Sequence, residues 1–383
     1  MSFTATLSED QSAIVASVRE FAEEVLAPHA NEWDATHTLP LDALRLAGEL
    51  GLGSVYTSEE HGGSALDRVC TALVFEELAR GDTAVAAYIS IHNMAVWMID
   101  TFAADDVRAA WVPRLAAMEE LASYCLTEPD AGSDAAALRT SAVRDGDDYV
   151  LTGVKQFISG AGAAAVYVVM ARTGGAGAKG ITSFVVPADS PGLSFGPLEK
   201  KMGWNAQPTR QVIFDGVRVP ASHRMGEEGS GFAIAMKALN GGRLNMAACS
   251  LGGAQWALER AVAYVQQRVA FGSPLSEMQS VVFRIADMET SLQAARSLVR
   301  AGAEALDRGA DDVAARCAMA KRFATDAAFE VANDALQLHG GYGYLHEYGI
   351  ERVVRDLRVH QILEGTNEIM RLIVGRHLLG GGR

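Results

Sequence analysis

Cysteine is scarce in this chain, with only Cys70, Cys125, Cys249 and Cys317 among 383 residues. The four are far apart, with no C-x-x-C pair and no histidine at the spacing of a metal site. We therefore expect no metal, and thiols that are buried as small apolar side chains in a reducing compartment.

Positive charge is also in short supply. The chain has 33 Lys and Arg against 47 Asp and Glu, a net charge of -14, and its pI is near 5.1. This balance excludes nucleic acid as the main partner, because neutralising phosphates requires a basic face. An anionic small ligand is still compatible, since it needs only a local positive pocket.

Long hydrophobic runs are missing as well. No uninterrupted apolar run is long enough to span a bilayer. The first stretch, "MSFTATLSEDQSAIVASVREFAEEVLAP", is acidic and amphipathic and does not have the charged-then-apolar pattern of a signal segment. We expect no membrane insertion and a cytoplasmic location.

The composition, 49% hydrophobic and 21% charged, is ordinary for a globular protein of two or three domains. Up to about residue 120 the pattern is helical. Ser8 precedes apolar residues at helical spacing, among them Ile14, Val18 and Phe21. The stretch "AVAAYISIHNMAVWMIDTFA" is apolar almost all round, which predicts a buried helix.

Near residue 123 short β-rich runs begin, such as "YVLTGVKQFIS", "AVYVVMAR", "ITSFVVP" and "RQVIFDGVRVP". From "GFAIAMKALNGGRLN" onward the pattern is helical again, with amphipathic stretches at 278–308, 312–339 and 366–379. The expected fold class is multi-domain α+β. It has an N-terminal α-helical domain (1–122), a middle β-barrel or β-sandwich domain (123–231) and a C-terminal four-helix-bundle domain (232–383).

A dinucleotide fingerprint is the obvious cofactor test. "GAGAAA" at 160–165 matches G-x-G-x-x-A by letters, but it precedes a strand instead of following one and opening a helix. A turn into a strand is the better interpretation. If the chain binds a dinucleotide, it does so without a Rossmann βαβ unit.

Two segments of the β part are candidate ligand contacts. "YCLTEPDAGSD", residues 124–134, is either an interdomain loop or a compact donor set, because Thr127, Ser133 and the backbone N–H groups around Gly132 suit phosphates or a heterocycle edge. "KQFISGA", residues 155–161, adds an aromatic and a hydroxyl at what we expect to be the start of a strand. Phe157 is equally compatible with a core position.

The helical part carries further candidates. Arg243 in "LNGGRLN" and Arg268 in "QQRVAFGSPL" fit either structural ion pairs or ligand contacts. The glycines of "QLHGGYGYL" either cap a helix or let a ligand approach the backbone. In "HQILEGTNEIMR", Glu364 beside Gly365 is either a solvated helix end or a base.

Taken in order, these segments resemble the acyl-CoA dehydrogenase family, which is flavin-dependent. "YCLTEPDAGSD" corresponds to the family's flavin loop, "KQFIS" to its β-domain flavin contact, and "RVAFG…Q" to its subunit-crossing segment. "QLHGGYGY" matches a further FAD segment, and "EGTNEI" matches the motif of the base. The resemblance covers essentially the whole chain, including the α-β-α order.

The resemblance implies FAD as the cofactor and Glu364 as the catalytic base. The implied substrate contacts are Ser133, Asn240, Gly241, Gly242, Arg243, Gly365 and Arg376. The implied FAD contacts are Tyr124, Cys125, Leu126, Thr127, Gly132, Ser133, Phe157, Ile158, Ser159, Arg268, Phe271, Met278, Gln279, Gln337, Leu338, His339, Gly340, Gly341, Thr366, Asn367 and Glu368. Phe157 departs from the family pattern, in which a Trp is frequent at this position; flavin stacking survives on a phenyl face.

The implied reaction is α,β-dehydrogenation of an acyl-CoA. Glu364 takes the α-proton while the β-hydrogen leaves as hydride to flavin N5, and the backbone N–H of Glu364 stabilises the enolate-like charge. Within the family the sequence is similar to the short- and branched-chain members, which implies isobutyryl-CoA as substrate. 2-Methylbutyryl-CoA and butyryl-CoA are the alternatives. A homotetramer and electron-transfer flavoprotein as acceptor are also implied.

Three rival interpretations stay open. A flavin oxidase on the same fold would pass electrons to oxygen, although 383 residues is compact for the larger two-bundle oxidases. A nitroalkane-type oxidase would be expected to carry Asp at the position of Glu364. A non-catalytic scaffold that kept the fold would bind no FAD.

Overall fold

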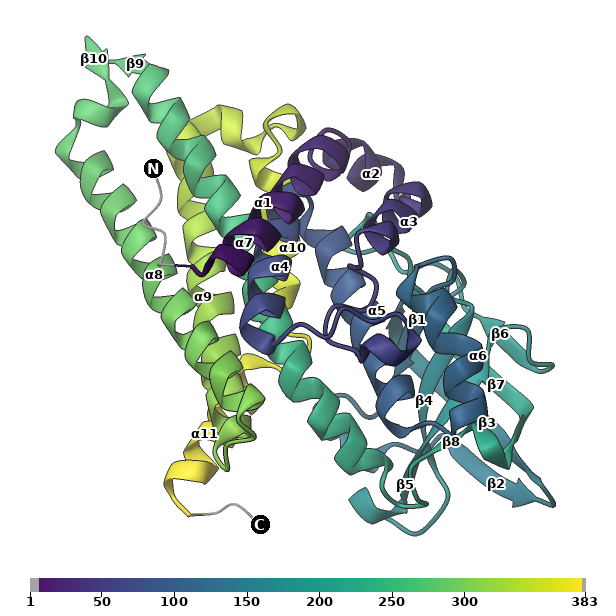
Figure 1. Ribbon diagram of the computed structural model, residues 1–383. Helices are drawn as coiled ribbons and strands as arrows, with labels where there is room; N and C mark the ends of the chain where they lie inside the picture. The colour runs from purple at the N-terminus through teal and green to yellow at the C-terminus, as the bar shows by residue number, and fades with distance from the viewer. Residues whose placement is uncertain (1–6, 381–383) are drawn as a thin grey trace.

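The computed structural model describes residues 7–380. Helices come first along the chain, a sheet follows, and long helices complete it (Figure 1). The predicted order of a helical part, a β part and a second helical part is confirmed.

The N-terminal part is helical, as its periodicity predicts. Ser8 caps the first helix in a reciprocal capping box with Gln11. The apolar stretch predicted to be a buried helix forms α5, which is buried along most of its length and is capped by Asp82. Among the helices of residues 7–380, none combines the length and the hydrophobicity that crossing a bilayer requires. The helices are α1 (Glu9–Phe21), α2 (Ala30–Thr36), α3 (Leu41–Glu49), α4 (Arg68–Gly81), α5 (Thr83–Phe102) and α6 (Asp105–Ala116).

The middle part is one mixed sheet of eight strands in the order β6-β7-β3-β2-β4-β5-β8, with β1 pairing in parallel with β4. A single residue pair, Ser141 with Arg172, joins β2 to β4, so the sheet consists of two halves that meet along a short seam. The strands are β1 (Ala122–Cys125), β2 (Ser141–Asp145), β3 (Asp148–Ser159), β4 (Val166–Arg172), β5 (Ile181–Pro187), β6 (Leu193–Phe195), β7 (Thr209–Pro220) and β8 (Arg224–Met225).

Two of the predictions from the sequence concern strands of this sheet. "GAGAAA" forms a turn that leads into β4, as expected. "KQFIS" was expected at the start of a strand, and that prediction is wrong, because these residues form the end of β3. The twelve-residue strand runs past a register shift between Lys155 and Ile158, so the alternation that marks a strand is interrupted before the strand ends.

The C-terminal part is a bundle of long helices, with α7, α8 and α9 side by side (Figure 1). A small hairpin of β9 and β10 lies at one end of the bundle and α11 lies at the other. α4 and α5 pack against α7, which joins the N-terminal helices to the bundle. The elements are α7 (Gly231–Gln267), β9 (Val269–Ala270), β10 (Ser273–Pro274), α8 (Gln279–Asp307), α9 (Val313–His339), α10 (Ile350–His360) and α11 (Asn367–Leu378).

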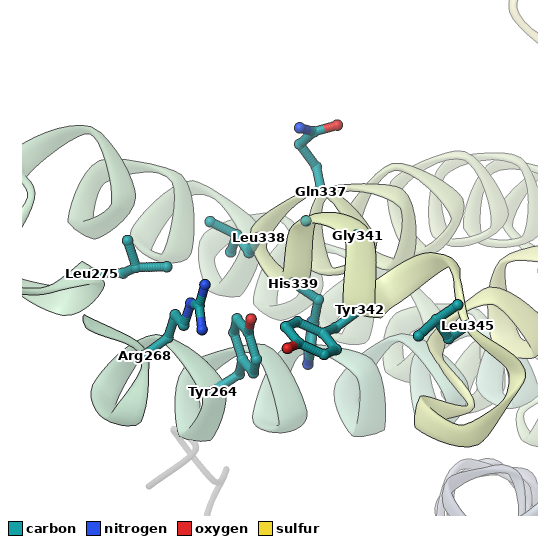
Figure 2. A pocket seen from close by; sticks show the side chains of 10 residues that line it. Tyr264, Arg268, Leu275, Gln337, Leu338, His339, Gly341, Tyr342 and Leu345 are labelled. Carbon is teal, nitrogen blue, oxygen red and sulfur yellow. The ribbon is translucent and has the colours of Figure 1, made fainter. Parts of the chain in front are cut away.

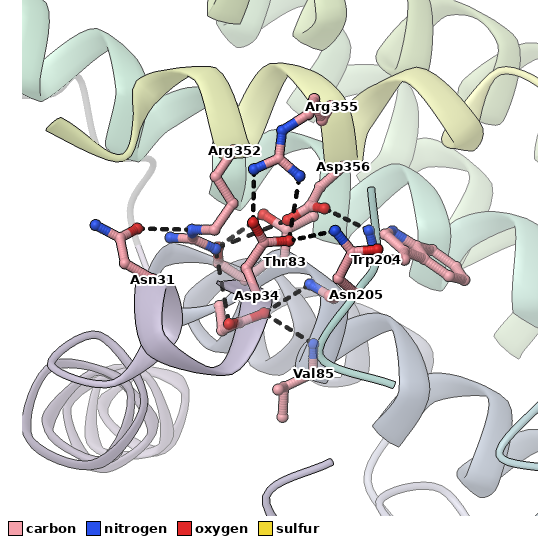
Figure 3. A network of polar contacts seen from close by, with 12 residues as sticks. Asn31, Asp34, Thr83, Val85, Trp204, Asn205, Arg352, Arg355 and Asp356 are labelled. Atoms are coloured by element: carbon pink, nitrogen blue, oxygen red, sulfur yellow. Dashed lines mark hydrogen bonds and ion pairs between the residues drawn. The ribbon is translucent and has the colours of Figure 1, made fainter. Parts of the chain in front are cut away.

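A polar network fixes α10 where the three parts meet (Figure 3). Arg355 pairs with Asp34 of α2 at 2.6 Å, and Arg352 lies 3.7 Å from Asp356 within α10. Asp356 also accepts a 2.6 Å hydrogen bond from the backbone N–H of Trp204, in the loop between β6 and β7. Removing one member of a buried pair typically costs about 3–5 kcal/mol. The network therefore holds the helix that leads into "EGTNEI".

Candidate active site

Glu364 lies in the loop between α10 and α11, on a backbone that few residues adopt. Its φ is 56°, and the φ of Gly365 is 89°. Gly365 adopts this region freely, whereas a left-handed non-glycine residue costs of the order of 1–3 kcal/mol. The strained residue of this turn is therefore Glu364 itself, and Gly365 continues the left-handed backbone beside it.

The Glu364 carboxylate is withdrawn from solvent. Oε2 is buried and has no hydrogen-bond partner within residues 7–380, although part of the side chain keeps some exposure. Burial raises the pKa of Glu364 to about 7, against the lowering influence of the Arg243 and Lys321 charges. A carboxylate with this proton affinity can act as a base near neutral pH.

Two adjacent glycines of α7 make room for this arrangement. A Cβ atom on Gly242 would lie 2.8 Å from Oε2 of Glu364, and one on Gly241 would lie 2.8 Å from Nη1 of Arg68. Glycine inside a helix is destabilising by roughly 0.5–1 kcal/mol relative to alanine. The close approach of the carboxylate to the α7 backbone explains why Gly242 occupies a helix interior.

Arg243 faces the same loop. Its side chain is buried, with Nε donating to the Glu364 carbonyl oxygen at 3.2 Å and Nη1 donating to Asn240 Oδ1 at 2.9 Å. Arg243 and Asn240, both expected to contact the substrate, are thus bonded to each other. The guanidinium fixes the backbone of Glu364.

The segment "YCLTEPDAGSD" approaches Glu364 through Tyr124 in β1. The Tyr124 hydroxyl is buried without a hydrogen-bond partner within the described residues. Burial raises the pKa of Tyr124, and the nearby negative charge of Glu364 raises it further. Cys125 lies in the core, whereas Gly132 and Ser133 are exposed, with open space beside Gly132. The backbone of Leu126 and Thr127 is tied to β3, because their carbonyl oxygens accept bonds from Lys155 Nζ and Gln156 N.

The end of β3 presents an aromatic ring. Phe157 is 63% exposed, has φ 59° and lies at the register shift between β3 and β7. Such bulges re-aim side chains and are frequent next to active sites. Ile158 packs into the core, and the Ser159 carbonyl accepts a 2.7 Å bond from Ser123. The Phe157 ring, unlike that of a core residue, is available to a ligand.

Backbone strain marks several of the predicted positions. Within residues 7–380, seven non-glycine residues have positive φ, and three of them, Phe157, Phe271 and Glu364, are predicted site residues. Strained backbones persist where the surrounding structure enforces them, and they gather at functional sites. Positive φ is thus a feature that these three predicted positions share with His37, Ala65, Met118 and Trp204.

A second group of predicted residues lines a pocket of about 350 Å³ at the other end of the bundle (Figure 2). Gly340 adopts φ 59° and ψ -138°, and a side chain on Gly340 or Gly341 would meet open space. Phe271, at the tip of the β9–β10 hairpin, is 99% exposed. The lining residues are Tyr264, Arg268, Leu275, Gln337, Leu338, His339, Gly340, Gly341, Tyr342 and Leu345.

Not every predicted residue in this group offers its side chain to the pocket. His339 is buried, stacks on Tyr264 at 4.5 Å between ring centroids and bonds to the Ala335 carbonyl. Met278 is the N-cap residue of α8, and Gln279 is the first residue of that helix. Gln337 is exposed and points away from the Tyr264 ring in Figure 2.

The residues around Glu364 and the residues that line the pocket of Figure 2 are far apart in one chain. Lys321 contacts the Glu364 loop, and Gln337 lies sixteen residues further along the same helix, α9. At 1.5 Å per residue this corresponds to about 24 Å. One chain therefore does not bring Glu364 and the pocket of Figure 2 together.

The remaining predicted residues lie around α11. Thr366 caps this helix, and Asn367 is buried and bonded to Lys321, Thr325 and Asp326. Glu368 is exposed and lies 3.5 Å from Arg371. Arg376 is exposed in the last turn of α11, away from the Glu364 loop.

Three residues near Glu364 were not predicted from the sequence. Lys321 is fully buried and donates to the Gly365 carbonyl, and its only signal is a lysine within the alanine-rich "CAMAKRFA". Arg68 lies over the Tyr56 ring at 3.6 Å, with Nη1 buried and unbonded within the described chain. Burial raises the pKa of Tyr56, and the charge of Glu364 raises it further. Nothing in the local sequence pattern of Tyr56 or Arg68 indicates this position.

The chain is similar to known proteins over almost its whole length. Residues 8–119, 123–217 and 229–379 match the N-terminal, middle and C-terminal domains of acyl-CoA dehydrogenase. The chain is 52% identical over 373 residues to "Isobutyryl-CoA dehydrogenase, mitochondrial" of Bos taurus, and 50% identical over 373 residues to the protein of that name from Dictyostelium discoideum. Each alignment covers 97% of this chain and 90% of the relative. The structure of butyryl-CoA dehydrogenase from Megasphaera elsdenii is similar with a TM-score of 0.95 and 38% identity, covering 98% of this chain and all of that one.

Proposed function

Because this chain belongs to the acyl-CoA dehydrogenase family, we propose that Glu364 is the base that removes the α-proton of a short branched-chain acyl-CoA. The family carries out flavin-dependent dehydrogenation of acyl-CoA, and FAD is its cofactor. The observation that carries the proposal is the buried Oε2 of Glu364, which lacks a hydrogen-bond partner within residues 7–380 and belongs to a carboxyl group whose pKa is about 7.

The residues of the Glu364 loop suit proton abstraction next to a thioester. The α-proton of an acyl-CoA is weakly acidic, so negative charge that develops on the carbonyl oxygen needs a hydrogen-bond donor. The backbone N–H of Glu364 donates to no group within residues 7–380, and the left-handed turn presents it together with the side chain. Arg243 holds the carbonyl of the same residue. The α-proton moves to the Glu364 carboxylate; FAD, when bound, supplies the acceptor for the hydrogen and electron pair that leave the β-carbon.

The predicted cofactor residues fit FAD in kind. A flat aromatic face at Phe157 suits the flavin ring. Open space beside Gly132, Gly340 and Gly341 allows a ligand to approach the backbone closely. Arg268 in the pocket of Figure 2 supplies positive charge for a phosphate.

The separation of the two groups supports assembly from more than one subunit. We propose that Arg268, Phe271 and the Gln337–Gly341 segment contact FAD bound mainly by a neighbouring chain, in a homotetramer. A fully exposed Phe271 on a strained backbone is consistent with a position that another subunit covers.

Isobutyryl-CoA is the proposed substrate. The support is the sequence identity of 50–52% to two proteins named isobutyryl-CoA dehydrogenase, which extends over nearly the whole chain. 2-Methylbutyryl-CoA and butyryl-CoA are the alternatives, because one methylene in an apolar pocket changes binding by only about 1–3 kcal/mol. We propose electron-transfer flavoprotein as the acceptor of the electrons. A cytoplasmic location stays a prediction, and the two named relatives are mitochondrial by name.

The substrate assignment is tested by comparing kcat/KM for isobutyryl-, 2-methylbutyryl-, butyryl- and isovaleryl-CoA with a dye acceptor. The highest value with isobutyryl-CoA is expected. A higher value with any other member of the set would replace it as the substrate.

The class of reaction is tested separately. Glu364→Gln is expected to purify yellow with FAD and to lose nearly all turnover with every thioester. Undiminished activity in that variant would refute Glu364 as the base. Rapid peroxide formation by the wild-type protein in oxygen without dye would show an oxidase instead.

A further inference from the structure

Lys321 is a buried cation behind the Glu364 loop. It lies on α9 with no exposed surface. Nζ donates to the Gly365 carbonyl oxygen at 2.9 Å and to Asn367 Oδ1 at 3.0 Å. From the neighbouring helix α7, Arg243 donates to the Glu364 carbonyl oxygen. Two consecutive carbonyls of the left-handed turn are thus held by two cations from two different helices.

We propose that Lys321 is a positioning residue for the base. Its ammonium holds the Gly365 carbonyl so that the side chain and the N–H of Glu364 face the substrate, and its charge favours the ionised carboxylate. This inference rests on the proposed role of Glu364 and adds a residue that acts through it.

The complete burial of Lys321 indicates that its charge does more than donate hydrogen bonds. Withdrawing an ammonium group from water is strongly unfavourable, and a neutral amide could donate to the same two oxygens at a smaller cost. Burial lowers the pKa of Lys321 to about 8 and the charge of Arg243 lowers it further, while the negative charges of Glu364, Asp326 and Glu368 raise it. The attraction between the ammonium and the Glu364 carboxylate offsets part of the burial cost, and it also stabilises the ionised form of the base.

The other groups around Glu364 do not supply the same effect. Arg243 on α7 also lowers the pKa of Glu364. Tyr124 from β1 and Tyr56 from the segment before α4 are neutral near pH 7, because burial raises the pKa of each hydroxyl. His360 of α10, which lies near Lys321, is neutral as well, since burial and the charge of Lys321 lower its pKa to about 3. Within residues 7–380, Lys321 and Arg243 are the charges that lower the pKa of Glu364, while the nearby Arg68 lies over the Tyr56 ring. Of the two, Lys321 is the one whose charge changes near neutral pH.

The pH range in which Glu364 and Lys321 are both charged follows from their two pKa values. As pH rises through about 7, Glu364 loses its proton and becomes a base. As pH rises through about 8, Lys321 loses its charge and its attraction for the carboxylate. Both groups are ionised mainly between these values. Removing the Lys321 charge raises the pKa of Glu364, so a higher pH is then needed to ionise the base.

Three substitutions separate the contributions of Lys321, each made in the full-length FAD-loaded enzyme. Lys321→Met removes both the donor and the charge, Lys321→Gln keeps a donor without the charge, and Lys321→Arg keeps both. A matched control is Lys201→Met. Lys201 is a half-buried lysine whose pKa burial lowers to about 8, and it donates to the carbonyls of Trp204 and Gln207.

The measurement is kcat and KM for the preferred acyl-CoA against pH, with FAD content as a check on folding. In Lys321→Met we expect kcat at pH 7 to fall on the order of 10²-fold, as for a misplaced catalytic group. In the profile of kcat against pH, the midpoint of the acidic limb should move to a pH higher by about 1, the low end of the effect of a neighbouring charge. Lys321→Gln should show the same displacement of the limb with a smaller loss of kcat, whereas Lys321→Arg and Lys201→Met should keep the wild-type limb.

The inference is overturned if the acidic limb of Lys321→Met or Lys321→Gln coincides with that of the wild type. If Lys321→Met does not yield yellow protein, the comparison of Lys321→Gln with Lys321→Arg decides, and coinciding limbs would overturn the inference equally. Failure of the proposed function is recognised separately, because it would appear as retained turnover in Glu364→Gln.

Discussion

Replacing Glu364 by glutamine should stabilise the protein at alkaline pH while abolishing its reaction. The carboxyl has a pKa of 4.5 when unperturbed and about 7 in the folded chain. Between these values the folded state binds the proton that the unfolded state has released, so stability falls as pH rises through this window. Above it, the buried carboxylate costs about 3 kcal/mol, an upper figure because part of the side chain keeps some exposure.

The size of the effect in a melting experiment follows from this shift. Of the total, roughly 2.5 kcal/mol develops between pH 5 and pH 8. For 383 residues, an unfolding entropy of about 2.1 cal/mol/K per residue converts this to a difference in Tm of about 3 °C. Glu364→Gln should therefore gain about 3 °C more over the wild type at pH 8 than at pH 5.

The assay is differential scanning calorimetry of both FAD-loaded proteins at the two pH values. Glu330→Gln is the matched control, because it makes the same substitution at an exposed glutamate of α9. In the same preparations, kcat of Glu364→Gln should fall by at least about 10²–10⁴-fold, the usual contribution of a general base. An equal Tm difference at pH 5 and pH 8 would show that burial does not raise the proton affinity of Glu364.

Three further substitutions test the geometry of the site. Gly242→Ala places a Cβ 2.8 Å from Oε2 of Glu364, so kcat should fall on the order of 10²-fold while FAD is retained. The control is Gly375→Ala, because a Cβ on Gly375 meets open space. Equal kcat values in the two variants would contradict the argument that Gly242 makes room for the carboxylate. Gly341→Ala should leave the Tm of the apoprotein unchanged but weaken FAD binding by about tenfold, as measured by fluorescence titration. An unaltered affinity for FAD would show that Gly341 does not contact the cofactor. Phe157→Ala should change apoprotein stability by less than about 0.5 kcal/mol, because the ring is 63% exposed, while lowering FAD affinity; a large loss of apoprotein stability would identify Phe157 as structural.

The local pattern of apolar residues was sufficient to predict the order of helical and β parts along the chain. Apolar residues at helical spacing after Ser8 and alternating residues in the β runs depend only on neighbours in the chain, and the structure confirms both. The run "YVLTGVKQFIS" coincides with β3 except for its first residue. Only the placing of "KQFIS" at the start of a strand was wrong, because a register shift interrupts the alternation near Phe157. That same shift exposes the ring, so the failure of the pattern coincides with the candidate cofactor contact.

The sequence by itself determined that a glutamate stands beside a glycine within a motif of a flavin-dependent family. Only the tertiary structure decided the state of that glutamate, because proton affinity depends on every group that surrounds the carboxylate. Arg243 and Lys321 reach the Glu364–Gly365 turn from positions 121 and 44 residues away in the chain, and Gly242 gives Oε2 its place against α7. Helices packed side by side bring these residues together, and no spacing along the chain encodes their distance from the carboxylate.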